Sequence, residues 1–309
     1  RSRLSAACMQ GFKRVGRGRC KVCPDEESNR YLLALGILAV VMGASGLIAM
    51  TIKSEGVVLT ISEATKKIAL NYLQVVSLAA LFPMQWPTEV EGFFAAQSAV
   101  SSASQALLSP DCELSWMSPA EAFYQKQMGF ALLPLCIVLS CKTVWYASRM
   151  FKCSCGYVAE SNVIDSAETV HGPDYPPKSF YDDRSILSWV VLLYLAYPTC
   201  VKQALAMLAC EKVGDNSWLA ADLEEPCMEG RHFVLLILLC IPQILLYVIG
   251  LPLGAMLILK KNKKHLNTIR MQFKWGLLYS GYRPEVWWWE MTIIIRKVCL
   301  VVVGGVFGS

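Results

Sequence analysis

Polar side chains at helical spacing lie inside an apolar stretch of this sequence. Within residues 68–86, Asn71, Gln74 and Ser77 follow one another at intervals of three residues, so they share one face of a helix. Polar groups in lipid are costly unless they bond to another helix or to water. We therefore expect this face to point inward, where it forms either interhelical hydrogen bonds or the lining of a water-filled pathway.

Ionisable side chains occur in other apolar stretches. Glu290 and Lys297 are seven residues apart and so lie on one helical face, where an internal ion pair or a bridge to a neighbouring helix would neutralise both. Lys202 lies about two turns before the outer end of its stretch, so its ammonium either snorkels towards an acidic loop or pairs internally. The candidate polar pathway or set of interhelical contacts comprises Asn71, Gln74, Ser77, Lys202, Gln243, Glu290 and Lys297.

Three consecutive tryptophans follow a basic loop near the end of the sequence. Trp287, Trp288 and Trp289 are typical of an interfacial belt, because the indole ring combines apolar contact with a hydrogen-bond donor for the wet side. We expect these residues to anchor the chain at the inner interface of the membrane.

The 13 cysteines include six in segments that we assign to the outside. An even number of cysteines in an oxidising compartment predicts disulfides. Cys210 and Cys227 flank one outside loop, and they are the candidate pair. The sequence has no glycine-rich phosphate loop, nucleophile elbow or zinc-protease helix, and its three histidines are scattered. We expect no enzyme activity, no cofactor and no metal site.

The composition shows which elements must carry these residues. The chain has 309 residues, of which 55% are apolar and 17% charged, and its mean hydropathy is +0.41. An ordinary soluble domain is about 45–50% apolar and about 25% charged. The sequence predicts an all-α, polytopic transmembrane bundle with about six crossings. These are residues 31–52, 68–86, 125–147, 186–209, 233–259 and a last, truncated one that begins near Trp287.

The distribution of charge in the loops predicts the orientation of the bundle. Basic residues gather in segments 53–67, 148–184 and 260–283, whereas carboxylates dominate segments 87–121 and 211–231. Lysine and arginine accumulate on the cytoplasmic side of membrane proteins. We therefore place the acidic loops and the N-terminal segment outside, although the N-terminal segment is itself basic.

The sequence is expected to be a piece of a longer chain, because it starts with Arg1 and stops inside an apolar run. Residues 1–28 are interpreted as the end of an extracellular Cys-rich repeat region. Residues 29–309 are interpreted as a transmembrane helical domain that is truncated at its C-terminal end. A bundle cut within a helix leaves an apolar face uncovered, so we expect the isolated piece not to be a competent unit.

Several short motifs, in their order along the chain, resemble one family. They are Trp86-Pro87, Asp111-Cys112, Tyr197-Pro198, the segment from Trp218 to Asp222, Tyr282-Arg283-Pro284, residues 287–290 and Arg296-Lys297. Together they resemble the TRP-like C-terminal membrane domain of large protist and algal proteins, which is related to fungal TRP-like channels and flavin carriers. The resemblance implies an ectodomain of ephrin-receptor-like or EGF-like repeats, and Cys20 to Cys23 are similar to the end of such a repeat.

Three functions are compatible with this resemblance. The first is a TRP-like cation channel coupled to a Cys-rich ectodomain, and an acidic outer surface would concentrate cations near its mouth. The second is a non-conducting cell-surface receptor or membrane anchor, and the third is a transporter of lipids or small molecules. The expected partners are the lipid bilayer, the chain's own ectodomain and further copies in a homo-oligomer, without nucleic acid. The expected location is the plasma or ciliary membrane, with the N-terminal segment extracellular.

Overall fold

The chain folds mainly into helices. The computed structural model describes residues 12–15, 19–22, 25–53, 61–79, 117–154 and 177–306. The predicted all-α class is confirmed, and strands form only two small sheets in this part of the chain. Strands β1 (Phe12–Val15) and β2 (Arg19–Val22) form an antiparallel hairpin. Cys8 and Cys23 of the predicted repeat lie outside the described residues.

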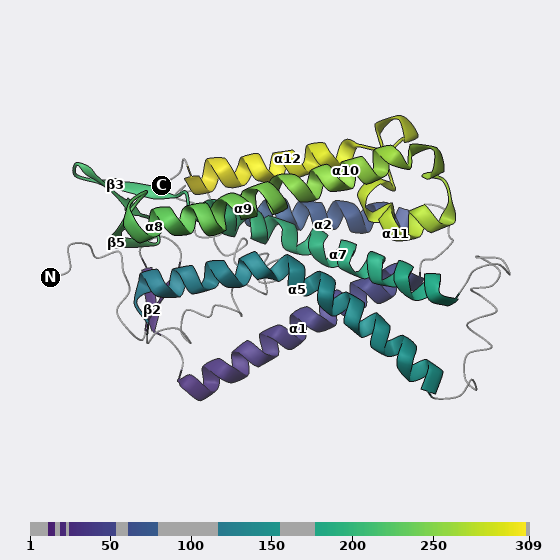
Figure 1. Ribbon diagram of the computed structural model, residues 1–309, viewed down its shortest axis with the longest axis horizontal. Helices are drawn as coiled ribbons and strands as arrows, with labels where there is room; N and C mark the ends of the chain where they lie inside the picture. Colours follow the sequence, from purple (N-terminus) through teal and green to yellow (C-terminus); the bar gives the residue numbers. More distant parts are fainter. Residues whose placement is uncertain are drawn as a thin grey trace.

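Four long apolar helices dominate the part of the chain that the structure describes, and Figure 1 shows their arrangement. They are α1 (Glu26–Lys53), α5 (Pro119–Ser154), α7 (Pro177–Ala206) and a composite helix formed by α8 (Gly230–Leu235), η1 (Leu236–Cys240), α9 (Ile241–Gln243), η2 (Ile244–Gly250) and α10 (Leu251–Lys261). The predicted boundary between residues 28 and 29 falls in the first turn of α1.

These four helices contain segments long and apolar enough to cross a bilayer: Glu27–Ile52, Ala120–Met150, Tyr181–Ala206 and Gly230–Lys261. Large apolar side chains such as Leu38, Leu139 and Leu246 are exposed on three of them. Such a surface suits lipid and not water. The chain is therefore consistent with an integral membrane protein.

Two predicted crossings correspond to shorter helices. Helix α2 (Ile61–Ala79) has 19 residues, and α12 (Trp289–Val301) has 13 and continues into η5 (Val302–Val306). Neither helix is among the four segments that meet the length and hydropathy needed for a crossing. The number of six crossings stays a prediction, and residues 80–86 of the second lie outside the described part.

Helices α5 and α7 extend beyond the apolar stretches predicted for them. At the start of α5, the Ser118 hydroxyl accepts from the Glu121 backbone N–H at 3.3 Å, and the Glu121 carboxylate accepts from the Ser118 N–H at 3.2 Å. This reciprocal capping box fixes where the helix begins. Residues 148–154 and 177–184, which we assigned to a basic loop, are helical.

Helix α7 lies at the centre of the bundle, between α5 on one side and α10 and α12 on the other (Figure 1). Its inner face contributes Tyr197, Val201 and Ala204 to one apolar cluster and Val190 and Tyr194 to another. The burial of α7 on several sides makes it the element against which the polar side chains of its neighbours are positioned.

The two ends of the bundle differ in structure and charge. A three-stranded antiparallel sheet of β3 (Cys210–Val213), β4 (Asn216–Leu219) and β5 (Asp222–Pro226) lies at one end (Figure 1). At the opposite end, α10 leads through η3 (Lys263–His265) into α11 (Ile269–Tyr279), and η4 (Pro284–Val286) precedes α12. Carboxylates therefore gather at one end and basic residues at the other.

Candidate functional site

Helix α2 presents a buried polar face to the bundle. Lys67, Asn71 and Gln74 are each only 8% exposed, whereas Ile68 and Tyr72 are more than half exposed. The intervals of four and three residues place the three polar groups on one side of the helix. This face is directed towards α7 and α12.

Lys297 of α12 meets this face. Its ammonium lies 2.6 Å from Asn71 Oδ1 and 2.6 Å from Gln74 Oε1, and it stands 5.0 Å from the centre of the Tyr194 ring. A buried ammonium requires acceptors of this kind, because its desolvation is otherwise very costly. The side-chain oxygens of Asn71 and Gln74 therefore both accept hydrogen bonds from the Lys297 ammonium.

Glu290 is the second residue of α12, and it is fully buried. Its carboxylate accepts from Tyr194 OH at 3.0 Å and from Tyr282 OH at 2.8 Å. The Lys67 ammonium forms an ion pair with it at 3.0 Å. Three donors thus surround this carboxylate, the condition under which a buried charge is tolerated.

Tyr194 of α7 connects the two charged groups. Its hydroxyl lies 2.8 Å from Asn71 Oδ1 and 3.0 Å from Glu290 Oε1, so its single proton has two acceptors. Its backbone oxygen accepts from the Gln74 amide at 3.4 Å. We call Lys67, Asn71, Gln74, Tyr194, Tyr282, Glu290 and Lys297 the polar cluster.

Tyr282 closes the cluster from the turn before α12. Its ring lies under the Lys67 ammonium, 4.1 Å from its centre, and the Ser280 backbone oxygen accepts from the same ammonium at 3.3 Å. Burial and the neighbouring Glu290 carboxylate raise the pKa of Tyr282 above its ordinary value. The hydroxyl therefore keeps its proton and remains a donor to Glu290 at neutral pH.

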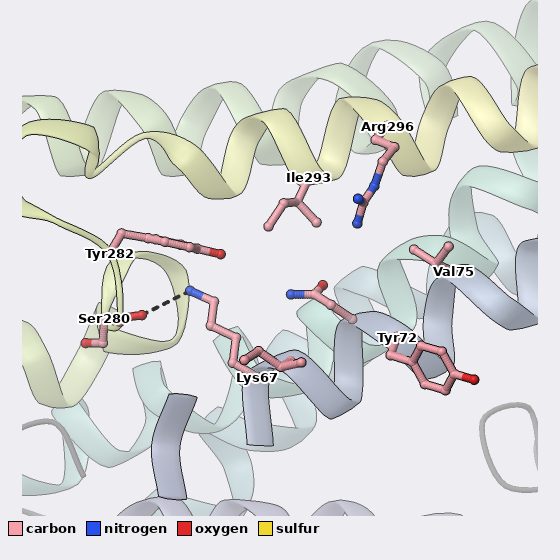
Figure 2. Close-up of a pocket in the computed structure, with 10 residues that line it drawn as sticks. Lys67, Tyr72, Val75, Ser280, Tyr282, Ile293 and Arg296 are labelled. Carbon is pink, nitrogen blue, oxygen red and sulfur yellow. Dashed lines mark hydrogen bonds between the residues drawn. The ribbon is translucent and has the colours of Figure 1, made fainter. Parts of the chain in front are cut away.

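A cavity of about 470 Å³ adjoins the polar cluster (Figure 2). It lies between α2, the turn after α11 and α12, and its wall contains Lys67, Asn71, Tyr282 and Arg296. Ile68, Val75 and Ile293 supply an apolar part of the wall. In Figure 2, Arg296 reaches from α12 towards the side from which Lys67 rises.

The structure brings together four of the seven residues predicted for a polar pathway or interhelical contact, namely Asn71, Gln74, Glu290 and Lys297. We expected Glu290 either to form an internal ion pair or to bridge to a neighbouring helix. It bridges to Lys67 of α2. Lys202 is half-buried in α7, and Gln243 is buried in α9 with its amide nitrogen unpartnered among the described residues. The side chain of Ser77 lies outside the described part.

Sequence reasoning missed three members of the cluster. Lys67 was counted as a loop residue, although it is four residues before Asn71 and so shares its face. Tyr194 and Tyr282 carry no signal of their own, because an aromatic residue in an apolar stretch is usually packed for its ring. Their hydroxyl partners are set by the meeting of α2, α7 and α12.

The expectation for the tryptophans is wrong in one position. Trp287 is buried and packs in an apolar cluster with Val190, Leu259 and Leu278, so it is not an interface anchor. Trp287 directly follows the 3₁₀ turn of η4. Trp288 and Trp289 are exposed and remain available for an interfacial position.

The two cysteines proposed as a pair are joined in the structure. Cys210 precedes β4 and Cys227 follows β5, and their Cα atoms are 6.0 Å apart. The disulfide closes the sheet over an apolar cluster that includes Met207, Leu219 and Phe123. It therefore braces one end of the bundle, remote from the polar cluster.

Comparisons with known proteins give one relative. The chain is similar to Cysteine repeat modular protein A of Toxoplasma gondii, with 23% identity over an alignment 353 residues long, gaps included. The alignment covers 98% of this chain and 11% of the relative. No family model and no solved structure matches the chain. The comparison agrees with a Cys-rich protein, whereas it shows no TRP-like family.

Proposed function

We propose that this chain is the membrane-embedded part of a large surface protein with a Cys-rich ectodomain, and that it serves as a non-conducting receptor segment or anchor. The similarity to a cysteine repeat modular protein supports the link to such an ectodomain. The distribution of charge supports an orientation with the disulfide-closed sheet outside and the basic α10–α11 segment in the cytoplasm.

One observation favours this role over that of a channel. The Lys297 ammonium occupies the space between Asn71 and Gln74, 2.6 Å from each side-chain oxygen. A mobile cation moving past these amides would have to displace a tethered one and approach Lys67 and Arg296 as well. The arrangement is that of polar side chains that hold helices together.

The rival function is a TRP-like cation channel. The resemblance of the sequence motifs motivates it, and the π-helical segments η1 and η2 give the composite helix two irregular stretches of the kind found at functional sites. In a channel, the polar cluster would open and the two amides would face water.

Planar-bilayer recording from the full-length protein in a cation gradient separates the two functions. We expect no specific current across voltage and membrane tension from the parent protein or from Asn71→Leu. Ala69→Leu, on the exposed side of α2, is the matched control. A cation current in the parent that Asn71→Leu alters and Ala69→Leu leaves unchanged would overturn the proposal and establish the channel.

A further inference from the structure

We propose that the cavity beside the polar cluster binds a phosphate-bearing group, such as the headgroup of an anionic phospholipid. Arg296 is an exposed residue on the cavity wall. Its guanidinium points across the cavity in Figure 2, and it forms no ion pair or hydrogen bond with any residue that the structure describes. A guanidinium held at a cavity in this way is suited to bidentate contact with phosphate oxygens.

The balance of charge favours an anion. Lys67, Arg296 and Lys297 bring three positive charges to this region, and Glu290 brings one negative charge. The carboxylate is fully buried, already has three donors and does not line the cavity. A ligand in the cavity therefore meets Lys67 and Arg296 without meeting a free carboxylate.

The rest of the wall fits a phosphate attached to an apolar body. The Asn71 side-chain nitrogen donates to none of the described residues, and Ser280 adds a second polar residue to the wall. Ile68, Val75 and Ile293 form the apolar part, and Ile68 is 69% exposed. A wall that combines polar donors with apolar side chains suits both the phosphate and the apolar body of a phospholipid.

The position in the bundle agrees with this ligand. The cavity is formed by the turn between α11 and α12, which lies at the basic end of the molecule (Figure 1). With that end in the cytoplasm, the cavity faces the leaflet that carries anionic lipids, where basic pockets between helices bind phosphorylated headgroups. A soluble phosphate ester offers the same chemistry, so the two sources need separate tests.

The test uses the full-length protein in a neutral detergent. Binding is measured for dioctanoyl phosphatidylinositol 4-phosphate, for dioctanoyl phosphatidylcholine and for soluble inositol 1,4-bisphosphate. We expect the phosphoinositide to bind at least about tenfold more tightly than the zwitterionic lipid. Arg296→Gln should weaken its binding about tenfold, the effect of losing one charge-assisted contact. Ile293→Trp, which fills the cavity and keeps every charge, should weaken it as well.

Arg149→Gln is the matched control, because Arg149 is an exposed arginine of α5 that does not line the cavity. It should bind like the parent. If the soluble bisphosphate binds as tightly as the phosphoinositide, the ligand is a free phosphate ester. If it binds more weakly than the phosphoinositide, the ligand is the lipid. The proposal is overturned if Arg296→Gln and Ile293→Trp both bind like the parent, or if Arg149→Gln weakens binding as much as Arg296→Gln.

Discussion

Lys297 is one of the residues through which α12 contacts the polar face of α2. A lysine in an apolar helix is expensive unless acceptors meet it, and here two amides of α2 do so. The same contact makes the amides of Asn71 and Gln74 part of a bond between helices. The Lys297 side chain thereby makes the polar stripe of α2, for which the sequence also allows a water path, part of an interhelical contact.

Replacement of Lys297 by methionine should therefore destabilise the membrane part. Methionine keeps much of the volume but leaves two buried amide oxygens with fewer donors, which costs about 1–3 kcal/mol. We expect a lower temperature at which the heated protein stops eluting as a single species in size-exclusion chromatography. Arg296→Met, at the exposed neighbouring position, is the control and should change this temperature little. An equal loss in both variants would contradict the assigned role.

Tyr282 allows a prediction on pH. Because burial and Glu290 raise its pKa above the ordinary value of 10.0, the neutral hydroxyl is favoured in the folded state. Its contribution is fully present below pH 10 and is lost as the pH rises towards the raised value. Tyr282→Phe should cost about 1 kcal/mol at neutral pH, and the difference from the parent should shrink above pH 10. A difference that grows above pH 10 would refute this assignment.

Among the elements, the composite helix has an irregularity with a clear steric requirement. In η2, a Cβ atom at Gly250 would lie 2.9 Å from the backbone oxygen of Leu245, whereas a Cβ at Gly254 meets nothing within 4 Å. The wider π turn brings that carbonyl close to position 250. Glycine is therefore required at one position and optional at the other.

Gly250→Ala should destabilise the helix by about 1–3 kcal/mol, the usual cost of overpacking. Gly254→Ala is the control and should be neutral or slightly stabilising, because alanine is the better helix former. Thermal stability of the two variants in the same detergent checks the prediction. If Gly250→Ala is as stable as Gly254→Ala, the π turn is not a fixed feature of this helix.

The elements also show how far the sequence alone leads. The four longest apolar stretches identify helices, because their length and hydropathy leave no alternative in lipid. The β3–β5 sheet was read as an acidic loop, since its strands are short and polar and depend on the Cys210–Cys227 bond and on turns. Four of the seven members of the polar cluster were predicted from their spacing within α2 and α12, whereas the hydroxyl contacts of Tyr194 and Tyr282 depend on the packing between helices.

At the scale of the whole molecule, the polar cluster joins parts of the chain that are far apart in sequence. Lys67 and Ser280 are separated by 213 residues, and Asn71 and Lys297 by 226. Apolar side chains cover much of the outer surface of the long helices, so packing of these surfaces against lipid does not distinguish one helix partner from another. The buried polar contacts are what specify that α2 lies against α7 and α12.

The Lys67–Glu290 ion pair offers the most direct test that the polar cluster holds the bundle together. Breaking a buried pair by removing one partner costs about 3–5 kcal/mol, whereas replacing both partners is much less costly. The measurement is a double-mutant cycle of Lys67→Met and Glu290→Gln, read as the thermal stability of the full-length protein in detergent. We predict that each single variant is strongly destabilised. The double variant should lose less stability than the sum of the losses in the two single variants. Strictly additive losses would show that Lys67 and Glu290 do not stabilise the bundle through their contact.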